Sequence, residues 1–95
     1  MRLDKFLQAS RIIKRRTVAK KICDGGNVLV NNQPAKAGKE LKVGDILEIH
    51  FSSRGVLTCE VQQIPKGGVR KEQASSLYRI ISETVLQDLP IYLKY

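Results

Sequence analysis

Residues 46–51, ILEIHF, alternate between two sets of side chains, and this alternation restricts the fold more than any other feature of the chain. Successive side chains of a strand point to opposite faces of a sheet, so Leu47, Ile49 and Phe51 share one face. The other face carries Ile46, Glu48 and His50. The sequence therefore predicts a strand that is buried on one side, with other elements covering its apolar face.

Neighbouring segments extend the sheet. Residues 27–30, NVLV, alternate again, and the NNQP that follows is typical of a tight turn, because Asn tolerates positive φ. A turn at Val43-Gly44-Asp45 and another at SSRG, residues 52–55, separate the strand at 46–51 from VLTCEVQQI, residues 56–64. These alternations and turns predict a small, mainly antiparallel sheet.

Two short helices are expected before the sheet. In the first, within residues 2–10, three apolar residues recur at i, i+3 and i+4: Leu3, Phe6 and Leu7. The second is expected to start with Thr17 as its N-cap, because a Thr hydroxyl can accept from a free backbone N–H of the first turn. Glycine at 25 or 26 ends it. Its apolar stripe is Val18, Ala19, Ile22 and Cys23.

The connector between the helices contains Ile12 and Ile13, of which one is expected to point inward. A third helix is expected over residues 72–86, where Ala74, Leu77, Ile81 and Val85 form a stripe and Pro90 marks a stop.

The expected fold class is α+β: two N-terminal helices packed on a mainly antiparallel sheet, plus a C-terminal helix. We divide the chain into a domain at 1–64, a linker at 65–71 with the sequence KGGVRK at its end, and a C-terminal helix and tail at 72–95. The last residues, IYLKY, have no assigned structure.

Positive charge is concentrated in the first part of the chain. Ten of the seventeen Lys and Arg residues, but three of the nine Asp and Glu residues, lie within residues 1–40. Six of these cations fall in the twelve residues 10–21, SRIIKRRTVAKK, which contain no acid. Lys14, Arg15 and Arg16 precede the expected helix start, where free N–H groups and the helix dipole also favour an anion. The pattern predicts a basic face for a polyanionic partner.

Structured RNA fits this face better than duplex DNA. Neither helix carries the polar base-reading residues expected of a major-groove reader, and short helices suit recognition of shape and phosphate. The basic region contains no aromatic residue except Phe6, which belongs to the apolar stripe, so binding of single strands by base stacking is not expected.

Other classes of function find little support. Cys23 and Cys59 lack metal-ligand spacing and are expected to be reduced core thiols, and His50, the single histidine, is expected to be structural. We therefore expect no metal, no cofactor and no catalysis. No apolar run approaches the roughly 18 residues that cross a bilayer, and the N-terminus lacks the apolar core of a signal peptide. A cytoplasmic monomer is expected.

Residues 2–49 resemble the S-four RNA-binding domain. The resemblance is carried by Arg-Leu-Asp before the first helix, by Arg-Arg-Thr at the start of the second, and by VLVNNQPAKAGKELKVGD, which is similar to the hairpin and turn of that family. The short layout looks most like its small stand-alone members, the ribosome-associated heat shock proteins and the RqcP-type factors of bacterial ribosome quality control. One departure is Asn31-Asn32, where Asn-Gly is common.

The resemblance implies the alpha-L RNA-binding motif and a non-catalytic factor. Such a factor binds rRNA and tRNA on a large ribosomal subunit that carries peptidyl-tRNA. RqcP-type members help to retain that complex while alanine is added to the stalled chain, so an alanine-tailing factor is a further expected partner.

Charge, position and resemblance together select twelve candidate RNA-binding residues. Arg2 and Arg16 stand out because both fall within family motifs and because guanidinium groups bind phosphate in a bidentate manner. Asp4 either orients one of these arginines or caps the first helix. The full set is Arg2, Asp4, Lys5, Arg11, Lys14, Arg15, Arg16, Thr17, Lys20, Lys21, Lys36 and Lys39.

Three alternatives stay open. A ribosome assembly factor would have the same basic face. An accessory to an RNA-modifying enzyme is possible because this domain is often joined to such enzymes, although 95 residues leave no room for a catalytic domain. A membrane-surface protein would need large apolar residues opposite the lysines of the second helix, and those positions are needed by the core.

Overall fold

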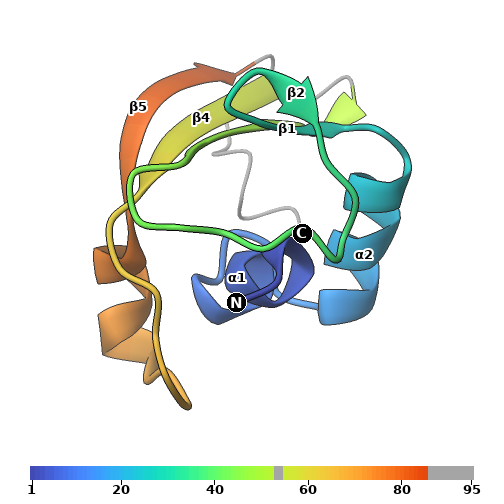
Figure 1. Cartoon of the computed structure of the whole chain (residues 1–95). Helices are drawn as coiled ribbons and strands as arrows, with labels where there is room; N and C mark the ends of the chain where they lie inside the picture. The colour runs from blue at the N-terminus through green and yellow to red at the C-terminus, as the bar shows by residue number, and fades with distance from the viewer. Residues whose placement is uncertain (53–54, 86–95) are drawn as a thin grey trace.

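The computed structural model describes residues 1–52 and 55–85, which form one antiparallel sheet with helices on one side of it (Figure 1). The strand order is β2-β1-β3-β4-β5, and each neighbouring pair is antiparallel. The strands are β1 (Val28–Val30), β2 (Gln33–Pro34), β3 (Ile46–His50), β4 (Gly55–Val61) and β5 (Tyr78–Val85). The helices are α1 (Leu3–Ala9), α2 (Arg16–Asp24) and the 3₁₀ helix η2 (Lys71–Leu77).

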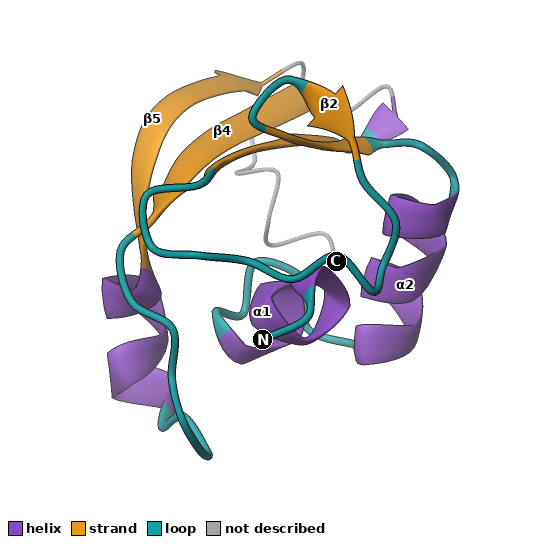
Figure 2. Ribbon diagram, in the orientation of Figure 1, coloured by secondary structure: helices purple, strands orange, loops and turns teal. Residues whose placement is uncertain are grey.

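The core lies between the sheet and the helices, as the alternation of β3 predicts. Leu47 and Ile49 are fully buried and Phe51 is almost so, and the same face of β4 contributes Leu57 and Cys59. From α1, the predicted apolar stripe of Leu3, Phe6 and Leu7 is completely buried in the same cluster. Figure 2 shows α1 and α2 together beneath the sheet. The predicted α+β class, with two N-terminal helices packed on a mainly antiparallel sheet, is confirmed.

The hairpin between β1 and β2 turns at Asn31 and Asn32, as expected. Their φ angles are 51° and 69°, the left-handed values that a two-residue type I′ turn requires at both positions. The Asn31 side chain also holds the start of β3: its Nδ2 donates to Asp45 Oδ1 at 3.1 Å, and its Oδ1 accepts from the Ile46 N–H at 3.0 Å. One Asn is therefore shared by two turns.

The start of α2 differs from the prediction. The helix begins at Arg16, with Arg15 as an extended N-cap residue and no side-chain cap hydrogen bond, so the assignment of Thr17 as N-cap is wrong. Ile12 and Ile13 are both fully buried, whereas the sequence predicted that one of them would point inward. The burial of these two side chains fixes the position of the connector. The first residue of the helix is then Arg16, one residue before Thr17. The predicted end at the glycines is correct, since Gly25 is the C-cap and Gly26 has a φ of 80°.

The C-terminal region also differs from the prediction. Of the described residues from 65 to 85, only residues 71–77 are helical, as the 3₁₀ helix η2, and the expected helix over residues 78–85 is wrong because these residues form strand β5, paired along β4. Ala74 and Leu77 of the predicted stripe are buried, but Ile81 is 47% exposed. Apolar residues four apart lie on one side of a helix and also on one face of a strand, so the spacing alone could not separate the two.

Some expected features lie outside the described residues. These are the middle of the SSRG turn, Leu86 with the end of the expected helix, the stop at Pro90, and the IYLKY segment.

Candidate nucleic-acid interface

The start of α1 is tied to the segment that follows the β1–β2 hairpin. The Leu3 N–H donates to the Lys39 carbonyl at 2.8 Å and the Asp4 N–H to the Ala37 carbonyl at 3.1 Å. Arg2 forms an isolated antiparallel bridge with Glu40. These backbone contacts satisfy N–H groups that a helix start leaves without intrahelical partners. They fix where the first residues of α1 lie relative to the rest of the domain.

Asp4 joins the starts of the two N-terminal helices. Its carboxylate is buried, with a side-chain exposure of 3%. Oδ1 accepts from Arg2 Nε at 3.2 Å, and Oδ2 accepts from Arg16 Nε at 3.3 Å. The N-cap residue of α1 is Arg2, which makes no side-chain cap hydrogen bond. Asp4 takes both roles left open by the sequence: it orients both arginines, and its Oδ1 also accepts from the Lys5 N–H at 2.8 Å, a free donor of the first turn of α1.

The two guanidinium groups are held but not covered. Each arginine side chain is 48% exposed, and each contact with Asp4 uses the Nε atom. The terminal nitrogens can therefore donate outward, in the planar arrangement that matches a phosphate. A shallow depression beside them is lined by Arg2, Asp4, Arg16, Thr17 and Lys20. This set brings together five of the twelve candidate residues, and we call it the Arg2–Arg16 site.

Thr17 lines this depression although it does not cap α2. It is exposed in the first turn of the helix, beside Arg16. Its hydroxyl can therefore contact a ligand bound there. The error about its capping role leaves its place among the candidate residues unchanged.

Lys36 and Lys39 lie at another depression, beside the hairpin, together with Gln33 and Pro34. Lys36 Nζ donates to the carbonyl of Asp24 at 3.1 Å, which ties it to the end of α2. Asp24 also accepts from the Ala37 N–H through its carboxylate at 3.0 Å. These two lysines extend the basic surface without joining the Arg2–Arg16 site.

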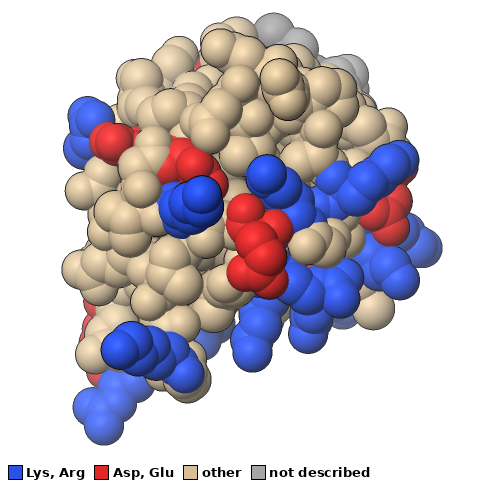
Figure 3. Space-filling view, viewed as in Figure 1, with Lys and Arg blue, Asp and Glu red and all other residues tan. Residues whose placement is uncertain are grey.

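The remaining candidates lie on α1, on α2 and on the connector between them. Arg11 and Lys14 line a third depression, and Arg11 and Lys5 a fourth. Arg15 and Lys21 are exposed and line none of these four depressions. Figure 3 shows the gathering of Lys and Arg over the helices, while most of the sheet on this face carries neither.

Most of these cations lack acidic partners. Within residues 1–52 and 55–85, no ion pair with a carboxylate is formed by Lys5, Arg11, Lys14, Arg15, Lys20 or Lys21. Clustered unpaired cations raise the local positive potential, which attracts a polyanion and repels other cations. Coulombic attraction to a phosphate backbone is the interaction that this surface offers.

Sequence reasoning missed Lys71 and Tyr78. Both line the depression that holds Arg11 and Lys14, although Lys71 was placed in a linker and Tyr78 in a helix. No local signal marks either residue. Their position depends on β5 pairing with β4, which places η2 beside the connector.

The structure also places the residues that could bind a metal or act in catalysis. No group of three or more His, Cys, Asp or Glu residues in the described part of the chain could hold a metal ion. Cys23 and Cys59 are buried free thiols, and burial raises the pKa of each to about 12. His50 Nε2 lies 3.1 Å from Glu48 Oε2 on the face of β3 away from the core. None of the described helices has the length and apolar character needed to cross a membrane.

Residues 1–47 match the S4 domain family. The chain is similar over most of its length to curated proteins named RQC P-site tRNA stabilizing factor. The one from Halalkalibacterium halodurans is 51% identical over 83 residues, which cover 87% of this chain and 92% of that protein. The one from Streptococcus pneumoniae is 47% identical over 88 residues, which cover 93% of this chain and 98% of that protein.

A solved structure shows the same fold. The trimeric structure of Vibrio cholerae Heat Shock Protein 15 superimposes with a TM-score of 0.77 and 30% sequence identity. The match covers 86% of this chain and 82% of that one.

Proposed function

We propose that this chain, which belongs to the S4-domain family of RQC P-site tRNA stabilizing factors, is a non-catalytic RNA-binding protein of ribosome quality control. It binds rRNA and the P-site tRNA on the large ribosomal subunit after a nascent chain has stalled. By holding peptidyl-tRNA there, it supports C-terminal alanine tailing by a separate factor. It acts in the cytoplasm, as a monomer.

The Arg2–Arg16 site is the observation that supports this proposal most directly. One buried carboxylate holds two guanidinium groups from different helices, and each remains half exposed. This arrangement lowers the entropy that the arginine side chains lose on binding, because their orientation is fixed before a ligand arrives. Two adjacent planar donors suit neighbouring phosphates of a folded RNA better than the edge of a base in a duplex.

The first experiment is sedimentation of ribosomal subunits with a tagged form of the protein. We expect the protein to migrate with large subunits in preference to small subunits and polysomes. Enrichment should be higher on large subunits that retain peptidyl-tRNA than on empty ones. An even distribution through the gradient, or absence from all ribosomal fractions, would overturn the proposed function.

Single substitutions then test the Arg2–Arg16 site. We expect Arg2→Ala or Arg16→Ala to weaken binding to large subunits by about 1–3 kcal/mol each, the range for hydrogen bonds to charged groups. Each variant removes one donor to the buried Asp4 carboxylate, so thermal melts should show both variants folded but less stable than the unmodified protein. Lys42→Ala is a control that removes one positive charge from an exposed position outside the four basic depressions. Equal losses for Lys42→Ala and Arg16→Ala would show that only net charge matters.

A further inference from the structure

The depression lined by Arg11 and Lys14 lies between the α1–α2 connector and η2, and it shares no lining residue with the Arg2–Arg16 site. Its volume is about 360 Å³, near the lower end of the roughly 300–1,000 Å³ typical of small-molecule sites. Three cations, Arg11, Lys14 and Lys71, stand around it, and Ala74 and Tyr78 contribute apolar surface. We call it the connector pocket.

The walls of the connector pocket are fixed by the core. Ile12 and Ile13, which lie between Arg11 and Lys14 in the sequence, are fully buried. Ala74 and Leu77 of η2 are each 3% exposed, so this helix is docked against the domain. Because both walls are anchored, the backbone positions of the three cations around the pocket are fixed before any ligand arrives.

Arg11 adopts an unusual backbone conformation in this wall. Its φ is +61°, a left-handed value that a non-glycine residue other than Asn or Asp seldom takes. Its N–H donates to the Gln8 carbonyl at 3.0 Å, which holds the turn after α1. The side chain lines the connector pocket and also the depression formed with Lys5 and Gly67. The unusual backbone thus places a cation where two depressions meet.

The charge of the connector pocket is not balanced by nearby acids. None of its three cations is paired with a carboxylate in the part of the chain that the structure describes, and no acidic residue lines the pocket. All three side chains are exposed. Such a pocket is complementary to an anionic group.

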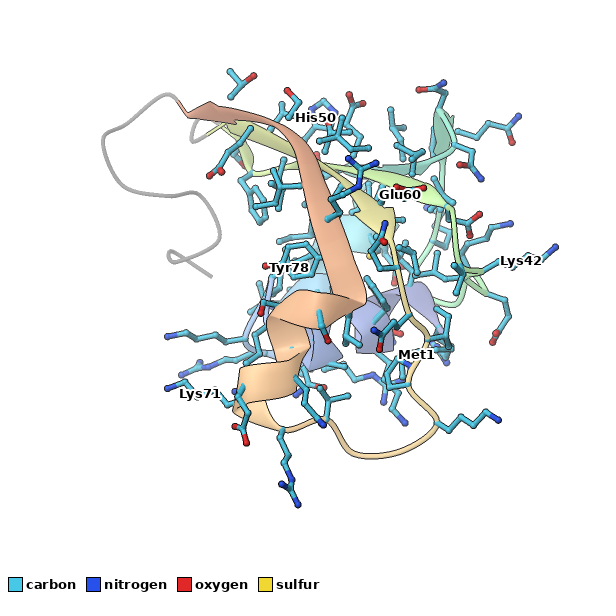
Figure 4. The ribbon with its side chains drawn as sticks, turned by 90° about the vertical axis from the view of Figure 1, so that its left-hand side faces the viewer. Met1, Lys42, His50, Glu60, Lys71 and Tyr78 are labelled. Atoms are coloured by element: carbon cyan, nitrogen blue, oxygen red, sulfur yellow. The ribbon has the colours of Figure 1, made fainter. Side chains whose placement is uncertain are left out.

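The apolar part of the pocket narrows the choice of ligand. Tyr78 is half-buried and packs against the core, and its ring lines the pocket beside the buried Ala74. Figure 4 shows Lys71 and Lys42 on opposite sides of the view, with Tyr78 between them and nearer to Lys71. A ligand with a flat apolar part and an anionic part would contact both the apolar surface and the three cations of the pocket. A nucleotide has this composition, since its base stacks on aromatic rings and its phosphate attracts cations.

We propose that the connector pocket binds an unpaired nucleotide of RNA, with its phosphate toward Arg11, Lys14 and Lys71 and its base against Tyr78 and Ala74. The proposal rests on the proposed function and extends its binding surface. RNA is favoured over an acidic peptide because the connector leads directly into Arg15 and Arg16, so one RNA-binding surface continues into the other. Two contacts on one rigid domain bind more strongly than either alone, because the second forms within the first complex.

The test compares Lys71→Gln with Lys42→Gln in binding to large subunits at several salt concentrations. Both changes remove one exposed positive charge, but only Lys71 lines the pocket. Loss of one phosphate contact should make the slope of log affinity against log salt less steep by about 0.7 for Lys71→Gln, the value per phosphate of a single strand. The slope for Lys42→Gln should match that of the unmodified protein. Equal slopes for the two variants would overturn the proposal.

Tyr78→Leu tests the base contact. Stacking is not electrostatic, so this change should lower affinity and leave the salt slope unchanged, provided that a thermal melt shows a folded protein. Unchanged affinity in the folded variant would refute the base contact. If Tyr78→Leu does not fold, a photo-crosslinking residue at Ser75, which also lines the pocket, replaces it. Crosslinks to RNA support the proposal, whereas crosslinks to a ribosomal protein, or to nothing, overturn it.

Arg16→Ala in the same assay separates this proposal from the proposed function. If Arg16→Ala weakens binding and Lys71→Gln behaves as Lys42→Gln does, the connector pocket alone is wrong. If the unmodified protein does not bind large subunits at all, the proposed function fails. If Lys71→Gln weakens binding and Arg16→Ala does not, the connector pocket stands and the Arg2–Arg16 site is misplaced.

Discussion

Asp4 is the one charged side chain that is buried in the described part of the chain, and it lies among cations. Burying a carboxylate is costly unless it is paired and hydrogen-bonded. Here Arg2, Arg16 and the backbone N–H of Lys5 all donate to it. The carboxylate is therefore satisfied, and its main effect is on the positions of the two arginines.

Asp4→Asn tests whether this carboxylate positions the arginines. An Asn side chain can accept through its oxygen, but its NH₂ group would face a guanidinium donor. We expect the free energy of unfolding to fall by about 1–3 kcal/mol, as for a disturbed hydrogen bond to a charged group. RNA binding should also weaken, measured by co-sedimentation with large subunits.

The direction of the binding change is informative. Removing a negative charge from a basic surface should strengthen RNA binding if Asp4 acts only through its charge. Stronger binding by Asp4→Asn would therefore refute the positioning role. Glu83→Gln, which also removes one negative charge but lies outside the four depressions and forms no ion pair within the described residues, controls for the effect of net charge.

Cys23 and Cys59 give a prediction about pH. Burial raises the pKa of both thiols from 9.0 to about 12, and for Cys23 the nearby Asp4 and Asp24 carboxylates add to the effect. The folded state thus favours the neutral thiols. This contribution to stability is complete below pH 9, the pKa of an exposed thiol, and is lost as pH rises towards 12.

We therefore expect urea unfolding to show a lower stability at pH 10 than at pH 7. The double variant Cys23→Ala, Cys59→Ala controls for the Lys and Tyr residues that titrate in the same range, and it should lose less stability over this interval. In the native protein at pH 7 a thiol reagent should react with neither cysteine, and both should react after unfolding. Rapid labelling of the native protein would contradict the burial of these thiols.

At the scale of the elements, the two asparagines of the β1–β2 turn contribute differently to the fold. Asn31 and Asn32 both have positive φ, but only the Asn31 side chain is hydrogen-bonded to residues before β3 and at its start. Glycine adopts positive φ without strain. We expect Asn32→Gly to change stability by less than about 0.5 kcal/mol, because Asn-Gly is the preferred type I′ pair.

Asn31→Gly should be more costly. It keeps the backbone conformation but removes two exposed hydrogen bonds, so we expect a loss of about 0.5–1.5 kcal/mol in chemical denaturation. If the two variants are equally stable, the link from this turn to Asp45 and Ile46 contributes nothing to the fold.

β5 is the element that most changes the shape of the molecule relative to the prediction. Seven of its eight residues pair with β4, and Ile81 lies where the register shifts between Thr58 and Cys59. Pairing with a neighbouring strand satisfies the backbone groups of β4 on that side, a gain that a helix at the same place would not provide. The segment is also rich in β-branched residues, which suit a strand.

At the scale of the whole molecule, the basic surface makes binding dependent on salt. If five to eight phosphates are neutralised, the slope of log affinity against log salt should be roughly −4 to −7. The measurement is titration of large subunits with the protein at several salt concentrations. A slope near zero would show that phosphate neutralisation does not drive binding.

Alternation, turns and charge could be read directly from the sequence because they depend on local spacing. The two N-terminal helices, the buried face of β3, the hairpin at Asn31 and the concentration of cations in residues 1–40 were all predicted in this way. Local rules suffice there because each element contains its own periodicity and its own turn residues. The resemblance of residues 2–49 to the S-four domain added the expected function.

Contacts between distant parts of the chain were decided by the tertiary structure. The sequence placed Arg2 and Arg16 near helix starts but could not show that Asp4 holds both. It could not place Lys71 and Tyr78 beside the connector, because that depends on β5 joining the sheet. Spacing of apolar residues fits both helix and strand in residues 77–85, and only pairing with β4 decides between them. Periodicity is a property of a segment, whereas a binding site forms from segments that packing brings together.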